Sequence, residues 1–562
     1  MEPSLTEFPK HIDMKFTKFL PIIIVVLICI PVVLPYFQSG YFPTHDGQWA
    51  VVRLGDMFRQ LRDLQIPPRM SGALNFGYGY PLFNYTYPFP YYLGILLYVP
   101  LHSFILSIKL IFILSVFISA IGMYVCSYKL WKDRSAGVVA SILYIYLPYR
   151  MVDLYVRGSI GESLSFALFP LIFYLVLRLF DNAFGRATVV LLSLLIGTLV
   201  MTHNIMAVLF FPLLITFAVA RIIREKRFDV AQSLFLCFLL GAGVSFFFWF
   251  PALFEKGNIL LSKIPIADRQ LYFVKPLSLI LPSWGYQPPT EVGGFSYQIG
   301  ISQIISVLLT LIIIIYTFVK NKLLLTPAKY YALIISVCFL ISLLMLFPFT
   351  DFVWKHTPLL KEINYPWTLL APMGFLSSLL AGFLIIQGKY LKYFGFILAF
   401  LSVILTIQYA HPQSFVDHSD NYYLTNEATT TSSNELMPLW VKEQPNEHFK
   451  EKVVIKSGSA QISNISTNSK FLKFNYKSIG EVTFRINTIY YPGWNAYVNG
   501  ERAKINYDNN KGVMEISSNQ YRDTVSLYFN ETFPRVIADT VTVLSLFVIL
   551  FILLRPILLF KS

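Results

Sequence analysis

Apolar segments long enough to span a membrane recur along the whole chain and constrain its fold more than any other feature. Hydrophobic residues make up 55% of the chain and charged residues 14%, which is too apolar for a soluble protein of this length. About twenty apolar residues suffice for a helix to cross a bilayer. We expect twelve spans, near 19–37, 103–128, 135–149, 163–180, 187–202, 205–222, 230–252, 298–319, 328–348, 367–388, 391–409 and 535–558.

Basic residues fall in alternate loops between these spans. They are Lys129, Lys132, Arg134, Arg178, Arg186, Arg221, Arg224, Lys226, Arg227, Lys320, Lys322, Lys329, Lys389, Lys392, Arg555 and Lys561. Because Lys and Arg concentrate in cytoplasmic loops, we expect a multi-pass plasma-membrane protein with both termini in the cytoplasm. These loops also account for the net charge of +14. No nucleic-acid-binding motif accompanies the charge, so no nucleic acid partner is expected.

The long loops fall on the opposite, extracytoplasmic side, and the last of them is large enough for a domain. From Val453 onward it shows alternating runs such as FLKFNY and VSLYFN, which are typical of β-strands. Residues 411–450 are polar, and we expect a loosely ordered linker with a short helix there. The predicted domains are a transmembrane domain at 1–409 with a first outer loop at 38–102, an extracytoplasmic β-sandwich-like domain at 410–534, and a final transmembrane helix with a cytoplasmic tail at 535–562.

The first outer loop opens with an acid and continues as an amphipathic stretch. His45 and Asp46 directly follow the first span. Apolar residues then recur at helical spacing, at Trp49, Val52, Met57, Phe58, Leu61 and Leu64. Arg53, Asp56, Gln60 and Asp63 fall on the other face. Such a helix should lie in the plane of the membrane surface, with Asp56 and Asp63 in solvent.

Ionisable and polar groups gather at the outer ends of the spans, where they are costly unless they are paired or functional. The candidates are His45, Asp46, Arg53, Arg69, Asp153, Arg157, Glu162, His203 and Asn204. A helix bundle could bring them into one pocket. Structural roles are open as well: Asp46 could cap a helix, Arg157 and Glu162 could pair with each other, and His203 could bond backbone.

Five stretches resemble a known family: THDGQWAVVRLGDMF, IPPRMSGALNFGYGYPLFNYTYPFPYYLG, VRGSIGESLSFALFPLIFY, MTHNIMAVLFFPLL and NYPWTLLAPMGF. Together with the order of spans and loops, they resemble the GT-C superfamily of membrane glycosyltransferases. The details resemble the "6-pyruvoyl-tetrahydropterin synthase-related" membrane proteins. The stretch YYPGWNAYVNGERAKI resembles the outer domain of YfhO-like membrane proteins. The resemblance implies a GT-C-like fold that covers most of the chain.

The resemblance implies transfer of a sugar from a polyprenyl-phosphate donor to a glycan or envelope-polymer acceptor on the outer face. Asp46 takes the position of the first-loop catalytic acid and would act as general base. Many such enzymes have two adjacent acids there, whereas Asp46 lies between His45 and Gly47. A second catalytic acid could be Glu162 or Asp153, or be missing, which leaves dependence on a divalent metal open.

Arg157, Arg69 or His203 would stabilise the leaving phosphate. The other substrate-binding candidates are His45, Arg53, Asp153 and Asn204. Direct displacement would invert the anomeric centre, and the outer β-domain would hold the acceptor. The alternative is a non-catalytic membrane protein, either a transporter of lipid-linked saccharide or a scaffold that binds envelope polymer.

Overall fold

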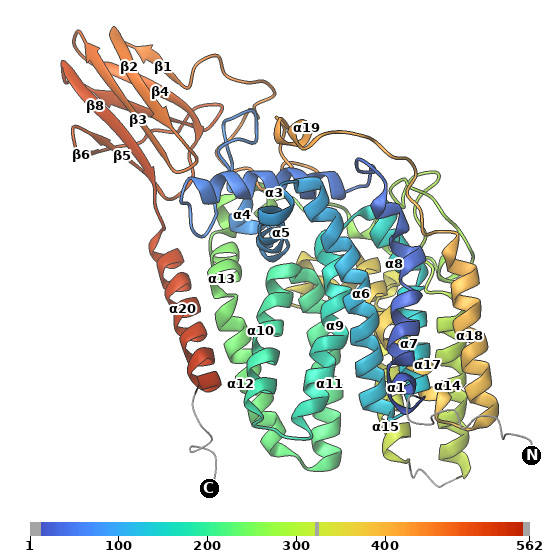
Figure 1. Ribbon diagram of the computed structural model, residues 1–562. Coiled ribbons are helices and arrows are strands. Elements are labelled where there is room, and N and C mark those ends of the chain that lie inside the picture. Colours follow the sequence, from blue (N-terminus) through green and yellow to red (C-terminus); the bar gives the residue numbers. More distant parts are fainter. Residues whose placement is uncertain (1–12, 321–324, 555–562) are drawn as a thin grey trace, which may run out of the picture.

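The computed structural model describes residues 13–320 and 325–554. Long helices run side by side as a bundle, and a domain of strands lies beyond one end of it (Figure 1). We call this the sheet-bearing end. Of the residues used to predict orientation, Lys322, Arg555 and Lys561 lie outside the described residues, as does the end of the predicted span 535–558.

Nine helices in the described parts of the chain are long and apolar enough to cross a membrane. The first, Phe19–Phe37, combines α1 (Asp13–Leu27), α2 (Ile30–Val33) and η1 (Leu34–Phe37). The seventh, Pro366–Ile385, combines η9 (Pro366–Leu369) and α17 (Leu370–Ile385). The others are α6 (Phe104–Trp131), α9 (Ile160–Leu179), α11 (Asn204–Glu225), α14 (Ile301–Lys320), α15 (Pro327–Leu344), α18 (Lys389–Ile407) and α20 (Phe533–Leu554).

The three remaining predicted spans are bent or short. One is α7 (Arg134–Ile145) followed by α8 (Pro148–Val152) and the π-helical turn η2 (Asp153–Arg157), with a bend of 48°. Pro148 begins the second part, and a proline disfavours helical backbone in the residue before it. Another is α12 (Phe228–Val244) with α13 (Phe246–Phe254), bent by 69° at Ser245. The third is α10 (Arg186–Thr202), with 17 residues. Each predicted span thus has a helical counterpart.

The basic loops meet at the end of the bundle away from the sheets. Lys392 lies 3.5 Å from the Asp133 carboxylate, and Lys129 pairs with Asp181. From the neighbouring loop, Arg227 donates to the Phe180 carbonyl at 2.6 Å. These basic loops, which alternate with the long loops along the sequence, therefore lie at the same end of the bundle. The predicted number of spans requires this arrangement.

The first long loop forms a platform over the sheet-bearing end. It contains α3 (Gly47–Arg62), α4 (Leu82–Tyr85) and α5 (Phe89–Leu101), and α3 runs across the ends of the bundle helices (Figure 1). The expectation that Asp56 is solvated is wrong, because its side chain is 2% exposed. The polar face of α3 faces protein, whereas Leu64, just beyond the helix, is 69% exposed.

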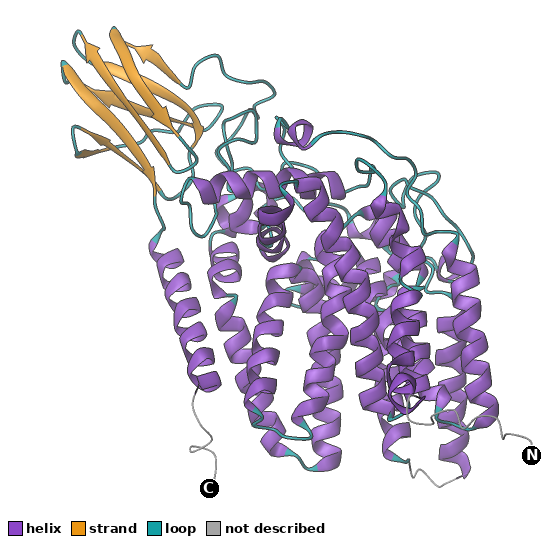
Figure 2. Ribbon diagram, viewed as in Figure 1, coloured by secondary structure: helices purple, strands orange, loops and turns teal. Residues whose placement is uncertain are grey.

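The strands form two antiparallel sheets (Figure 2). One has the order β1-β4-β7 and the other β2-β3-β8-β5-β6. Their bounds are β1 (Val453–Ser457), β2 (Ala460–Thr467), β3 (Phe471–Ser478), β4 (Val482–Ile489), β5 (Trp494–Val498), β6 (Glu501–Ala503), β7 (Val513–Ser518) and β8 (Arg522–Phe529). Phe474 of β3 and Phe484 of β4 are both fully buried, with ring centroids 5.0 Å apart. The two sheets therefore share one core, as alternating apolar residues predict.

Residues 411–450 contain the expected short helix, but they are not a loose linker, because they contact both the bundle end and the sheet domain. Their short helix α19 (Asp420–Leu424) begins with Asp420, whose carboxylate accepts the first backbone N–H groups of α6, from Phe104 at 2.7 Å and Ile105 at 3.0 Å. Further along, Pro438 bridges to Ile259 in the loop after α13. That loop and the later ones contain α16 (Asp351–His356) and the short turns η3 (Lys256–Asn258), η4 (Leu260–Ser262), η5 (Arg269–Tyr272), η6 (Pro276–Leu279), η7 (Pro348–Thr350) and η8 (Leu360–Glu362).

Candidate functional site

A cavity of about 590 Å³ opens at the sheet-bearing end, between α3, the η2–α9 turn and the α10–α11 turn. We call it the first cavity. Its acidic, basic and imidazole lining residues come from four parts of the chain and are His45, Asp46, Arg53, Arg157, His203 and Glu435. Five of these six were candidates from the sequence. Because ionisable groups converge there beside a membrane bundle, the first cavity is the candidate functional site.

Asp46 is held by backbone contacts that leave its carboxylate to the cavity. Its N–H donates to the Arg157 carbonyl at 2.8 Å. Asp46 occupies the N-cap position of α3, yet its side chain makes no capping hydrogen bond. Thr44 Oγ1 accepts from the Gly47 N–H instead, at 2.9 Å. Capping therefore does not explain the presence of an acid at this position.

The turn that meets Asp46 requires glycine at position 158. Gly158 has a φ of +60°, and a Cβ there would lie 2.2 Å from Thr44 Oγ1. Only glycine adopts this backbone without strain and lets the two chain segments approach so closely. The close approach brings the η2 segment, with Arg157, beside Asp46.

Arg157 is fixed at the cavity wall from behind. It pairs with Glu162, and its guanidinium lies 4.6 Å from the centre of the Trp367 ring. Glu162 is fully buried, does not line the cavity, and also accepts a hydrogen bond from the Tyr149 hydroxyl at 2.6 Å. The structure thus places Glu162 behind Arg157, where it can hold the guanidinium but cannot reach a substrate.

His203 presents a neutral imidazole to the cavity. Its Nδ1 accepts from the Met206 N–H at 3.3 Å, which leaves the proton on Nε2. Burial, reinforced by the charge of Arg157, lowers the pKa of His203 to about 3. Its ring stacks on Tyr87, with centroids 5.2 Å apart. The neighbouring candidate Asn204 is exposed and lies outside the cavity lining, because it starts α11 with its side chain turned away.

His45 and Arg53 complete the wall on the platform side. His45 Nε2 donates to the Tyr286 carbonyl at 2.8 Å. Arg53 Nε donates to Thr430 Oγ1 at 3.1 Å, and its Nη2 donates to the Thr430 carbonyl. Arg53 therefore both lines the first cavity and hydrogen-bonds to Thr430, in the segment that precedes the sheet domain.

Asp153 belongs to the bundle interior. It is fully buried, lies 3.3 Å from Arg150 Nη1 and accepts from the Ser163 hydroxyl. It does not line the first cavity, because the η2 turn points it toward α9. The expectation that Asp153 contacts substrate is therefore not supported by its position.

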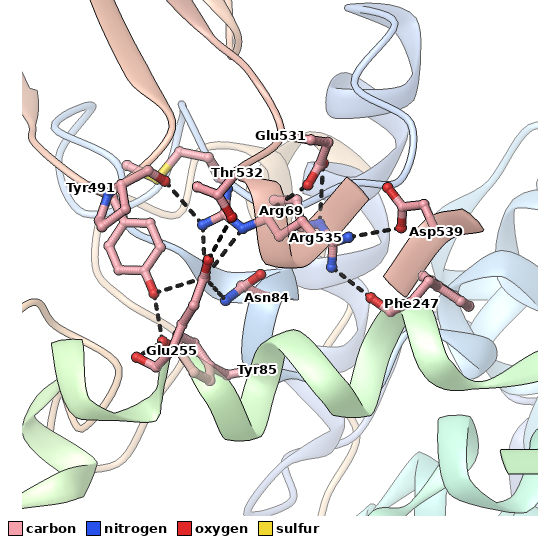
Figure 3. Close-up of polar contacts among 12 residues, drawn as sticks. Arg69, Asn84, Tyr85, Phe247, Glu255, Tyr491, Glu531, Thr532, Arg535 and Asp539 are labelled. Carbon is pink, nitrogen blue, oxygen red and sulfur yellow. Dashed lines mark hydrogen bonds and ion pairs between the residues drawn. The ribbon is translucent and has the colours of Figure 1, made fainter. Parts of the chain in front are cut away.

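Arg69 lies in a different network, at the junction of the platform, α13 and α20 (Figure 3). It is 1% exposed and donates to Glu531 at 3.2 Å, Asp539 at 3.1 Å and the Phe247 carbonyl at 2.8 Å. Its charge is neutralised by acids that lie more than 460 positions away in the sequence. Arg69 consequently joins parts of the fold and does not line the first cavity.

One segment that lines the first cavity was not predicted from the sequence. We call residues 429–439 the strap. It adds Ser432, Ser433 and Glu435 to the lining. The strap is anchored by the buried Thr430, which also contacts Tyr80 at 3.0 Å, and by the Leu261 N–H, which donates to the Glu435 carbonyl at 2.8 Å. A run of small polar residues carries no signal for such a contact.

A family model described as "6-pyruvoyl-tetrahydropterin synthase related domain; membrane protein" matches residues 83–413, more than half of the chain. The chain belongs to this family. This 6-pyruvoyl-tetrahydropterin synthase-related protein is also 24% identical over 344 residues to an uncharacterized protein of Lactococcus lactis subsp. cremoris (strain MG1363). The match covers 59% of the chain and 54% of that relative, so the chain spans about half of the relative's length.

Two solved membrane transferases are similar to this family member in outline. One is the Archaeoglobus fulgidus oligosaccharyltransferase in its apo form, with a TM-score of 0.40 at 13% identity over 74% of this chain and 57% of that chain. The other is the mycobacterial arabinofuranosyltransferase AftD, with a TM-score of 0.43 at 14% identity over 72% of this chain and 28% of that chain. Likenesses this distant do not transfer an activity.

Within residues 13–320 and 325–554, no three His, Cys, Asp or Glu side chains lie close enough to hold a metal ion. The acids and imidazoles that line the first cavity are Asp46, His45, His203 and Glu435. Among the described residues they therefore form no ready metal centre.

Proposed function

We propose that the protein is an integral-membrane glycosyltransferase that moves a sugar from a polyprenyl-phosphate donor to a glycan or envelope-polymer acceptor. The observation that carries this proposal concerns the Asp46 carboxylate, which makes no helix-capping hydrogen bond. It shares a cavity with Arg157, Arg53 and neutral His203 at one end of a membrane bundle. A base beside cationic and N–H donors suits displacement of a phosphate by a hydroxyl.

The position of the cavity fits a lipid-linked donor. The polyprenyl chain stays in the bilayer, so the reacting phosphate must be met at the ends of the spans. The first cavity lies at that depth, between the platform helix α3 and the turns that join the bundle helices. By the distribution of basic loops, this end is extracytoplasmic and both termini are cytoplasmic.

Asp46 would remove the proton from the acceptor hydroxyl as that oxygen attacks the anomeric carbon. The new bond joins the acceptor oxygen to the anomeric carbon, and the bond from that carbon to the phosphate oxygen breaks. The electron pair leaves on the phosphate, and attack from the opposite side inverts the anomeric centre. A phosphate is a good leaving group, so this step needs no separate acid.

Arg157 would stabilise the negative charge that develops on the leaving phosphate. Its guanidinium is already oriented by Glu162 and Trp367, so little reorganisation is needed at the moment of reaction. His203 adds a neutral N–H donor, and Arg53 adds a second positive charge. Glu162 acts as a positioning residue. The strap, with Ser432, Ser433 and Glu435, offers hydroxyls and a carboxylate to the acceptor.

The test is transfer by the purified protein in liposomes, with a radiolabelled polyprenyl-phosphate hexose and a glycan acceptor. Asp46→Asn should lower transfer by about 10²- to 10⁴-fold, the usual contribution of a general base. Asp417→Asn is the matched control, since Asp417 is exposed and does not line the first cavity. Equal transfer by Asp46→Asn would remove Asp46 as the base. Binding of the donor without transfer by the unmodified protein would favour the non-catalytic alternative.

A further inference from the structure

A second cavity, of about 390 Å³, lies between the C-terminal half of α3 and the sheet domain. It shares no lining residue with the first cavity. Its size falls in the range of small-molecule sites, which occur preferentially where domains meet. Its lining includes Asp56, Arg59, Gln60, Asp63, Phe449 and Lys452.

One face of α3 serves both cavities. Asp46 and Ala50 line the first cavity, and Gln60 and Asp63 line the second. Residues spaced by three or four positions share a helix face, and Arg53 and Asp56 continue the same row between these two pairs. At 1.5 Å per residue, the row places the second cavity about 15 to 25 Å from Asp46 along the helix. The polar face of α3, which was expected to be solvated, therefore faces the two cavities.

The charges around the second cavity balance. Asp56 and Asp63 supply two carboxylates, whereas Arg59 and Lys452 supply two cations. Burial raises the pKa of Asp56 to about 6 and lowers the pKa of Lys452 to about 7, so near pH 7 Asp56 is mostly ionised and Lys452 carries only part of its charge. A strongly charged ligand would therefore gain little here.

The polar groups suit hydroxyls as partners. The Lys452 ammonium donates to the carbonyls of Gly77 at 3.0 Å and Asn487 at 2.9 Å, and no carboxylate of the described residues forms an ion pair with it. Asp63 accepts from the Ser469 N–H at 2.8 Å through one oxygen. Carboxylates, amides and an ammonium that is not paired with an acid can each give or take a hydrogen bond from a sugar hydroxyl.

Aromatic rings supply the apolar part of the lining. Phe449 and Trp494 both line the second cavity. The Phe449 ring is partly exposed and lies 4.8 Å from the Lys452 ammonium. The C–H face of a pyranose packs on such a ring while its hydroxyls point to the polar groups at the ring's edge. Hydroxyl-rich and apolar surfaces combined on one small ligand are characteristic of saccharides.

We infer that the second cavity binds a neutral saccharide, a site that is separate from the proposed reaction centre. Only the identity of that saccharide as part of the acceptor rests on the proposed function, because binding itself does not require transfer. A glycan held here and reacting at Asp46 would lie along α3. The sheet domain would then select the acceptor by closing one side of the site.

The experiment measures binding of the full-length protein in detergent to an array of neutral gluco-, galacto-, manno- and rhamno-oligosaccharides, with uronic-acid-containing glycans as the anionic set. We expect binding to at least one neutral class. Ala73→Trp, which fills the cavity from its partly exposed rim, should weaken that binding at least tenfold. The exposed Ala428→Trp, outside the lining, is the matched control.

Two further variants keep the outcome decisive. Asp63→Asn, which retains an acceptor oxygen for Ser469, should weaken binding even if Ala73→Trp fails to fold. Asp46→Asn should bind as the unmodified protein does, so loss of transfer and loss of saccharide binding are measured independently. The inference is overturned if no neutral oligosaccharide binds, if the anionic set binds more tightly, or if both cavity variants bind normally.

Discussion

Arg535 at the start of α20 and Glu255 at the end of α13 form a buried ion pair, with 2.8 Å between Nη2 and Oε2 (Figure 3). Glu255 also accepts from Asn84 of the platform at 2.9 Å and from Thr532 at 3.0 Å. The Tyr85 hydroxyl donates to the Glu255 carbonyl at 2.8 Å. Platform, bundle and the junction to the sheet domain therefore meet at one carboxylate.

Removal of this carboxylate should destabilise the junction. Glu255→Ala leaves the buried Arg535 with only Glu531, at 4.0 Å, as an acidic partner, and breaking a buried ion pair costs about 3–5 kcal/mol. Lys256→Ala, at the adjacent position, breaks only a partly exposed pair with Glu362 and should cost less than about 1 kcal/mol. Thermal unfolding in detergent measures both variants. Equal midpoints for the two would contradict the importance of the buried pair.

Replacement of Arg157 by lysine should impair transfer although the charge is kept. Lysine cannot keep the planar contacts of Arg157 with Glu162 and Trp367. We expect transfer to fall by about 10²- to 10³-fold, the loss typical of one oriented donor at a developing charge. Arg227→Lys, at the opposite end of the bundle, is the control. Normal transfer by Arg157→Lys would mean that the guanidinium does not contact the phosphate.

His203 should make the protein less stable in acid. Its pKa is about 3 in the folded protein and about 6.5 in an unfolded chain. Between these values the unfolded chain binds more protons, so stability is present above about pH 6.5 and is lost as the pH falls toward about 3. His203→Gln should flatten this dependence, which thermal midpoints measured from pH 7 down to 4 would detect. The exposed His356→Gln should leave it unchanged.

Glu435 should affect the acceptor more than the donor. Its Oε2 accepts from the Ser433 N–H at 3.1 Å and from the Ser433 hydroxyl at 3.3 Å, which orders the strap above the first cavity. Glu435→Gln should raise the KM for the acceptor severalfold and leave the KM for the donor unchanged. Glu443→Gln, beyond the strap and exposed, is the control. A change confined to the KM for the donor would contradict a role of the strap in acceptor binding.

The spans could be predicted because their signal is local. A run of apolar residues must bury its backbone in helical hydrogen bonds when it enters a bilayer, and each predicted span has a helix. The bends at Pro148 and Ser245, of 48° and 69°, divide two of the predicted spans into shorter helices. The alternating basic loops likewise meet at one end of the bundle because helices of similar length reverse direction at each turn.

The candidate site was predictable only in part. Asp46, Arg157 and His203 could be named because ionisable groups are rare at the ends of apolar segments. Arg69 satisfied the same rule, yet its partners Glu531 and Asp539 come from the far end of the chain. Glu435 lies in a polar stretch, where a carboxylate is common, so its sequence neighbours did not indicate that it reaches the first cavity.

Sequence alone determined the membrane bundle, the amphipathic α3 and the two-sheet domain, since apolar length and periodicity act within one segment. Tertiary structure decided which polar residues share a cavity and which face of α3 is buried. Those outcomes depend on contacts such as Arg53 with Thr430, across 377 positions. No local pattern encodes a partner at that distance, because the free energy of such a contact is gained only when both segments are already folded.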